Sequence, residues 1–195
     1  MFELWKTQHP HSLFSITPNK NGFLPQMIPL RVLPDNYDKI NEILEKMKLS
    51  SPDSLLKNNE LAKYIDDNLP EYENIIKNEN NLQLLGSLFR DYCFMASAYS
   101  LETSHYNLKD GKYGLARDEL PNKLATPLKI LGDKLGSKPW LDYAYGYGLN
   151  NAILVDKNNP GDYRSYDTIR MFNGHDSESG FINVHVAMNS YTPEL

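Results

Sequence analysis

A lone histidine and a group of tyrosines are the residues of this sequence best suited to chemistry. His185 lies in the apolar stretch FINVHVAM, one helical turn after Phe181. A histidine among apolar residues is most simply a core residue whose ring nitrogens find partners inside the protein. The alternative is a polar group that faces a ligand pocket, because such pockets are mostly apolar with a few placed polar groups. Helical periodicity does not choose between these interpretations.

Three tyrosines alternate in the segment YAYGYG: Tyr143, Tyr145 and Tyr147. On a helix their side chains would splay over different faces. The simpler interpretation is that they lie at the edge of a core, each with a partner for its hydroxyl. The alternative is that one or two of them line an aromatic ligand site. Gly146 and Gly148, which lie between them, would let a flat ligand or a neighbouring backbone come close.

The sequence lacks the motifs of several common kinds of site. It has no glycine-rich phosphate loop, no Gly-x-Ser-x-Gly motif and no His-x-x-x-His pair. We expect the other histidines to be surface, capping or locally hydrogen-bonded residues, and no zinc site among them: His9, His11, His105 and His175. The single cysteine, Cys93, excludes an intramolecular disulfide, and its helical context favours a buried hydrophobe over a reactive thiol.

Composition favours a globular protein that binds neither nucleic acid nor membranes. The 195 residues suit one domain, or one domain with a small appendage, and the chain is 41% hydrophobic and 23% charged. The net charge of −5 gives no general attraction to phosphate backbones or anionic lipid. The first residues do not resemble a signal peptide and no run of about 18 apolar residues occurs, so we expect a cytoplasmic protein.

The elements that must position these residues are mostly helical. Prolines in residues 22–34, GFLPQMIPLRVLP, forbid a continuous helix, and we interpret this segment as a strap over a helical core. A helix is expected from an N-cap at Asp35 to Met47, and another from a cap at Ser51 to about Leu69.

The strongest helical pattern covers residues 81–102, which we interpret as a buried central helix. We also expect a solvated connection over 74–81, a loop over 103–121 and a helix over 124–135 that stops at Gly136. A further helix is expected over 140–154, and a polar loop over 173–180. In the helix after this loop, Phe181, Val184, His185 and Met188 share one face. Convincing strands are absent, so the sequence predicts an all-α fold.

Three segments resemble the indoleamine 2,3-dioxygenase family. They are GFLPQMIPLRVLP, LPNKLATPLKILGDKLGSKPWLDYAYGYGLNNAILVD and MFNGHDSESGFINVHVAM. They occur in the family's order and spread over nearly the whole chain. The resemblance implies an all-helical haem-binding fold. In it, residues 1–121 would form the strap plus a small helical domain, and residues 122–195 would begin the large domain that binds haem b.

The resemblance also implies an activity and roles for residues. Members of the family insert both atoms of O₂ across the indole C2–C3 bond of tryptophan or related indoles, which gives N-formylkynurenine in the kynurenine pathway. Tyr143 matches a substrate-pocket tyrosine, and Gly146 matches a small residue beside the haem plane. Phe181 matches an aromatic residue that packs on the indole at the distal haem face, and Ile182 stands where many relatives have a second phenylalanine. His185 matches the distal polar residue, which would act catalytically by bonding the indole N–H or tuning bound O₂.

The departures from the family matter as much. The resemblance implies a further part, of about the same length again, that supplies the proximal histidine, an arginine for the tryptophan carboxylate and a pocket-closing loop. We therefore expect no iron ligand in this chain, a proximal histidine beyond residue 195, and a truncated portion that is inactive alone or is completed by a C-terminal segment. A tryptophan of the family is Asn151 here. Two alternatives stay open: a catalytically dead helical binding or regulatory module, and a related haem protein acting on another indole.

Overall fold

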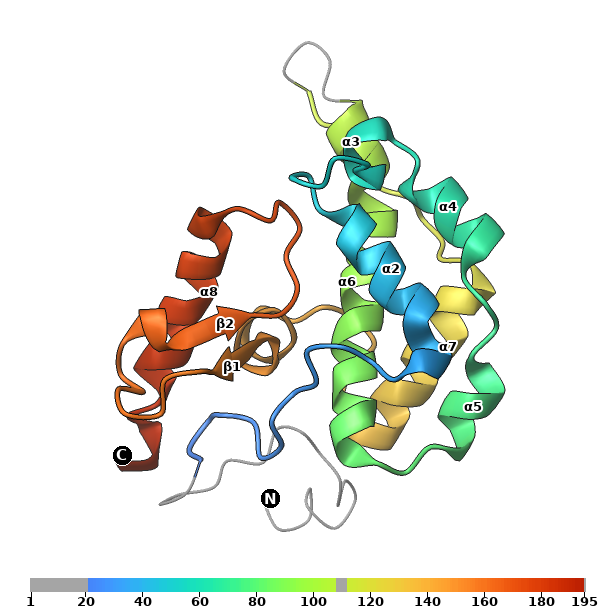
Figure 1. Ribbon diagram of the computed structural model, residues 1–195. Helices are drawn as coiled ribbons and strands as arrows, with labels where there is room; N and C mark the ends of the chain where they lie inside the picture. The colour runs from blue at the N-terminus through green and yellow to red at the C-terminus, as the bar shows by residue number, and fades with distance from the viewer. Residues whose placement is uncertain (1–20, 108–111, 195) are drawn as a thin grey trace.

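The computed structural model describes residues 21–107 and 112–194, apart from the side chain of His105, and contains two hydrophobic cores. Figure 1 shows α6 in the middle, with α4, α5 and α7 on one side and α8 with a small sheet on the other. The described residues are mostly helical, which confirms the predicted all-α class. His9 and His11 lie outside the described residues.

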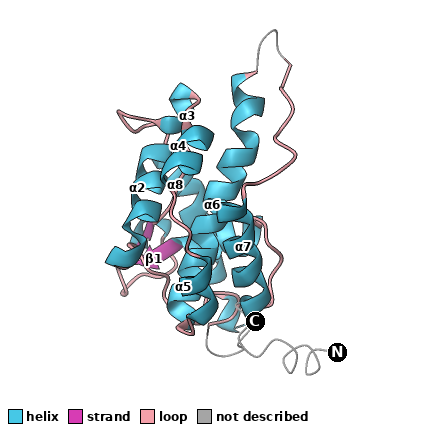
Figure 2. Cartoon of the chain, turned by 90° about the vertical axis from the view of Figure 1, so that its right-hand side faces the viewer, coloured by secondary structure: helices cyan, strands magenta, loops and turns pink. Residues whose placement is uncertain are grey.

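The larger core is helical. Figure 2 shows α7 beside the lower part of the longer α6. The elements around this core are η1 (Asp35–Tyr37), α2 (Asp38–Met47), α3 (Leu55–Asn58), α4 (Leu61–Asn68), α5 (Glu73–Asn78), α6 (Leu82–Tyr106) and α7 (Asn122–Leu135). The buried central helix was predicted, and Cys93 within it is fully buried, which raises the pKa of its thiol and keeps it protonated.

The smaller core lies between one helix and a two-stranded sheet. Strand β1 (Ala152–Leu154) pairs antiparallel with β2 (Tyr166–Thr168), and Ile182, Val186 and Ala187 of α8 (Asp176–Asn189) pack on them. The remaining short helices are η2 (Tyr143–Gly148), η3 (Leu149–Asn151), η4 (Tyr163–Ser165) and η5 (Thr192–Glu194). Because α7 shares the larger core as far as Leu135, that core extends past residue 121. The predicted domain division at residue 121 stays a prediction.

The strap was predicted, and its residues 28–33 lie against α6 and α2. The amide of Leu30 donates to the Ser87 hydroxyl, and the side chain of Asn41 exchanges two hydrogen bonds with the backbone of Leu33. Leu33 is buried, but Phe23, Met27 and Ile28 stay exposed. The strap therefore attaches through its backbone as much as through its apolar side chains.

Several local predictions were wrong. Asp35 does not cap α2 but begins a 3-10 turn. Ser54, not Ser51, accepts the capping bond, from the Lys57 amide. The helix predicted to run to Leu69 is broken because Asn59 takes a left-handed conformation, with φ of 59°.

Two more stretches also differ from prediction. The expected connection over 74–81 contains helix α5, whose Ile76 is buried in the larger core. The expected helix over 140–154 is instead a π-helical turn, a 3-10 turn and a strand. The C-terminal stop of α7 was correct, since Gly136 is left-handed with φ of 64°.

A buried charge cluster joins the two cores. The carboxylate of Asp91 on α6 accepts from Arg90 Nε at 2.7 Å and from Arg170 Nη2 at 2.7 Å. All three side chains are buried. Burial alone would raise the pKa of Asp91, but the two guanidiniums lower it below its ordinary value. Arg170 lies just after β2, so this cluster ties the small sheet to α6.

In the part of the chain that the structure describes, no helix is both long enough and apolar enough to cross a membrane.

We expect the substitution Asp91→Ala to destabilise the protein by about 3–5 kcal/mol, because it leaves the buried Arg90 without a counter-charge and Arg170 with only its longer ion pair to Glu45. The free energy of unfolding in urea measures the change. The matched control is Asp133→Ala, which removes an exposed helical ion pair with Lys129 and should cost less than about 0.5 kcal/mol. An equal loss of unfolding free energy in the two variants would contradict the proposed contribution of the buried cluster to stability.

Candidate functional site

Helix α8 carries apolar side chains on two sides. One side, with Ile182, belongs to the smaller core. The other side exposes the residues predicted to share a helical face, among them Phe181, Val184 and Met188. Exposed apolar groups of this size on one face indicate a surface that something else covers.

The short helix η2 places one tyrosine over this face. The Asp142 carboxylate caps η2 by accepting from the amides of Tyr145 at 2.6 Å and Gly146 at 3.1 Å. The cap fixes the chain so that Tyr145 points into the protein, and burial raises the pKa of its hydroxyl. Tyr143 points outward and is 54% exposed.

Tyr143, Phe181 and His185 lie together, and we call them the aromatic cluster. The Tyr143 hydroxyl lies 2.8 Å from Nε2 of His185, and Nδ1 of His185 lies 2.8 Å from the Phe181 carbonyl oxygen. The ring of Phe181 is 6.0 Å from that of Tyr143 and 4.9 Å from that of His185, and Phe181 is 50% exposed. The cluster thus offers a flat apolar area beside a polar pair.

Two other predicted site residues lie elsewhere. Ile182 is 1% exposed and packs in the smaller core, so it points away from the aromatic cluster. Gly146 is buried in η2, where a Cβ would come within 3.2 Å of both Asp142 Oδ2 and Leu141 Cδ1. The need for a small residue at position 146 therefore arises within η2 itself.

Glu178 is a site-supporting residue that the sequence analysis missed. Its buried carboxylate accepts from the Tyr147 hydroxyl at 3.0 Å and from the amides of Phe172, Asn173 and Gly174 at 2.8–3.2 Å. The available signal was an acidic residue at the third position of a helix, where glutamates cap. Burial and the neighbouring carboxylate both raise the pKa of Tyr147, so its hydroxyl stays protonated and donates.

Tyr147 links Glu178 to the aromatic cluster. Its ring stacks on Tyr143 at 6.3 Å, on Phe172 at 6.1 Å and on the buried Phe94 of α6 at 5.8 Å. The chain of rings starts in the larger core and ends at the exposed cluster. Tyr143 is therefore held both by its stacking on Tyr147 and by the backbone of η2.

Asn151, where the family resemblance led us to expect tryptophan, is a fully buried polar residue. Its amide nitrogen donates to the carbonyls of Tyr147 at 3.0 Å and Arg170 at 2.8 Å, and its oxygen accepts from the Arg170 amide at 2.8 Å. It holds η2 against the segment that leads to α8 through hydrogen bonds.

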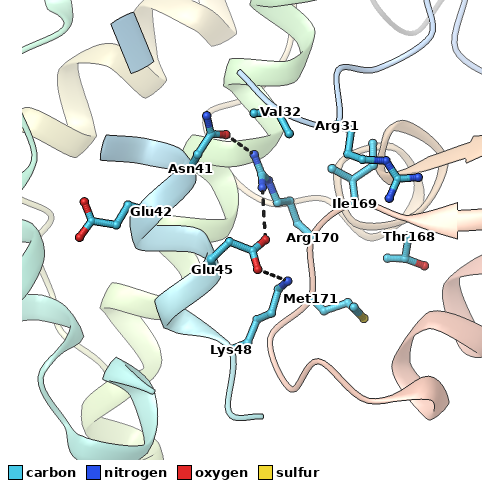
Figure 3. A pocket seen from close by; sticks show the side chains of 10 residues that line it. All are labelled: Arg31, Val32, Asn41, Glu42, Glu45, Lys48, Thr168, Ile169, Arg170 and Met171. Carbon is cyan, nitrogen blue, oxygen red and sulfur yellow. Dashed lines mark hydrogen bonds and ion pairs between the residues drawn. The ribbon is translucent and has the colours of Figure 1, made fainter. Parts of the chain in front are cut away.

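A separate open groove, of about 450 Å³, lies between α2 and residues 168–171 (Figure 3). The guanidinium of Arg170 lies between Asn41 and Glu45, and Glu45 also pairs with Lys48. The charged groups that line the groove have ion-pair partners, some of them outside it, and the aromatic cluster does not line it. Among the described residues, no group of three or more His, Cys, Asp or Glu side chains could hold a metal ion.

In a comparison with known protein families, residues 11–195 match the family described as indoleamine 2,3-dioxygenase. The matched range includes α8, η2 and the whole aromatic cluster. No curated protein matches the chain.

We expect Glu178→Ala to cost about 2–3 kcal/mol, because three backbone amides and a tyrosine hydroxyl lose their acceptor. The near-ultraviolet circular dichroism of the tyrosines should fall as Tyr147 loosens. Asp176→Ala, in the same first turn but exposed, is the control and should cost less than about 1 kcal/mol. An unchanged tyrosine signal in Glu178→Ala would rule out the proposed support.

Proposed function

The chain belongs to the indoleamine 2,3-dioxygenase family, and from this membership we propose that it forms the substrate-facing wall of a haem-dependent dioxygenase. The reaction proposed is the opening of the indole C2–C3 bond of tryptophan, or of a related indole, by O₂ to give N-formylkynurenine. The observation that carries the proposal is the aromatic cluster: Tyr143, Phe181 and His185 meet on one exposed face.

The chemistry of the cluster suits an indole. Phe181 and Tyr143 offer ring faces and edges to a flat apolar ligand. The Tyr143–His185 pair supplies polar atoms at the edge of that area, which can meet the one N–H of the indole. A largely apolar surface with a few placed polar groups is the usual form of such a site.

The same residues fit one side of a haem but not its iron ligand. Phe181 and Met188 are exposed apolar groups that can lie against a flat macrocycle. Both ring nitrogens of His185 already have partners, Tyr143 and the Phe181 carbonyl, so His185 suits the distal face rather than iron coordination. Haem, when bound, supplies the oxygen chemistry. The iron ligand is proposed to come from a further segment, as is the group that holds the amino-acid carboxylate.

What this chain contributes to the reaction is binding and orientation. Phe181 provides the area on which the indole ring packs and from which it excludes water. Tyr143 and His185 hold the hydrogen-bonding edge of the site, and Glu178 keeps α8 and Tyr147 in place beneath it. Ile182 lies in the smaller core, so a contact between its side chain and the indole remains only a prediction. The cytoplasmic location also remains a prediction.

A second candidate function is a helical binding module without catalysis. The hydrogen bonds of His185 favour this second function, because both of its ring nitrogens already have partners and no group of metal-binding side chains is found among the described residues. Sequencing the DNA beyond the Leu195 codon distinguishes the two candidates. A continuation that encodes a histidine-bearing helix supports the dioxygenase, and a stop codon with no complementing gene supports the module.

Titration with haemin, followed by the Soret absorption band, tests the proposed wall. We expect saturable binding that Phe181→Ala weakens by about tenfold, since a large part of an aromatic contact is lost. The control is Tyr113→Ala, which removes an exposed aromatic residue from the loop after α6 and should leave binding unchanged. No saturable band shift, or equal weakening in both variants, would count against the haem-facing role.

A further inference from the structure

The hydrogen bonds of His185 fix which of its nitrogens carries the proton. Nδ1 lies 2.8 Å from the carbonyl oxygen of Phe181, and a carbonyl oxygen can only accept. In neutral His185 the hydrogen must therefore sit on Nδ1. A neutral histidine side chain can carry its hydrogen on either nitrogen, so the helix backbone selects this tautomer.

The same logic fixes the direction of the next hydrogen bond. With the hydrogen on Nδ1, Nε2 of neutral His185 is an acceptor. The Tyr143 hydroxyl, 2.8 Å away, must then be the donor. Its only hydrogen points toward His185, and the Tyr143 oxygen is left with lone pairs for a partner from outside. Tyr143 is 54% exposed, so a ligand can reach it.

We propose that the Tyr143 oxygen, and not His185, accepts the N–H of an indole ligand, and that His185 is a positioning residue that acts through Tyr143. The inference deepens and rests on the proposed function. It assigns the site a preference for ligands that donate a hydrogen bond over ligands of the same shape that cannot.

The neighbouring rings place an indole where this contact can form. Phe181 lies 6.0 Å from Tyr143, centre to centre, with the rings steeply inclined. A flat ring lying on Phe181 thus has the Tyr143 side chain at its edge. The Tyr147 hydroxyl differs from that of Tyr143, because it lies against the buried carboxylate of Glu178 and not on the exposed face of the cluster.

The first test is nitrogen-15 magnetic resonance of the histidine rings at about pH 8.5, above the ordinary histidine pKa of about 6.5. We expect Nδ1 of His185 to give a protonated, pyrrole-type signal and Nε2 an acceptor-type signal. Tyr143→Phe should leave the tautomer unchanged and shift Nε2 toward the value of an unbonded nitrogen. Tyr163→Phe, which removes an exposed hydroxyl from η4, should change neither signal.

A protonated Nε2 in the unsubstituted protein, or an Nε2 signal that Tyr143→Phe does not move, overturns the inference. This result does not depend on indole or haem binding, so it is decided even if the proposed function fails.

The second test compares the binding of indole and 1-methylindole, which has no N–H. We expect indole to bind roughly fivefold more tightly, as one hydrogen bond would give, and Tyr143→Phe to abolish the difference. His185→Ala should reduce the preference because the Tyr143 hydroxyl is then free to rotate. His185→Gln should restore part of it, since its amide oxygen can accept the same hydrogen.

The outcomes separate the two proposals. Failure of both ligands to bind counts against the proposed function, whereas equal binding of both to the unsubstituted protein overturns the role of Tyr143. A preference for indole that survives in Tyr143→Phe but is lost in both His185 variants would make His185 the contact residue instead.

Discussion

One buried carboxylate determines how the parts of this protein fit together. Asp91 lies in the centre of α6 and neutralises two guanidiniums that come from different directions. Arg90 extends from it to the carbonyls of Leu30 and Asn150, and Arg170 reaches Asn41. The strap, α2, α6 and the chain around the small sheet thus meet at one charge. Since buried ions tolerate little displacement, the positions of these four parts relative to one another are restricted.

Short connections between Arg170 and α8 extend this restriction to the aromatic cluster. Arg170 is held by Asn151 through its backbone and by Asp91 through its side chain, and only a few residues separate it from the Glu178 cap of α8. Stacked rings lead from the core to Tyr143 by a second route. Two supports, which the Tyr147–Glu178 hydrogen bond joins, therefore reach the two sides of the Tyr143–His185 hydrogen bond, whose residues lie 42 apart in sequence. Rigid elements of this kind are what hold a polar pair in one geometry.

Periodic segments were predictable from the sequence, and segments set by side-chain hydrogen bonds were not. The apolar repeat of α6 and the glycine after α7 gave both elements, because a regular apolar repeat and a glycine stop are local signals of a helix. The stretch after Asp142 also looked helical, but its shape depends on the Asp142 cap and on Asn151, whose partners are distant in sequence. The convergence of Tyr143 with His185 followed from the family resemblance, since no period relates two elements that meet only in the folded chain. Glu178 had a local signal in the first turn of α8, and only its bond to Tyr147 joins elements that meet in the folded chain.

The aromatic cluster has a property that apolar periodicity does not reveal. Helix α8 is apolar on its buried side and also on its outward side, so covering the outward face removes further apolar area from water. Covering a histidine would normally cost energy, because a ring nitrogen without a partner loses its water. Here the Phe181 carbonyl and the Tyr143 hydroxyl satisfy both nitrogens in advance. The cost of desolvation then falls on the Tyr143 oxygen, and a flat apolar ligand with one N–H at its edge is the kind of molecule that removes this last cost.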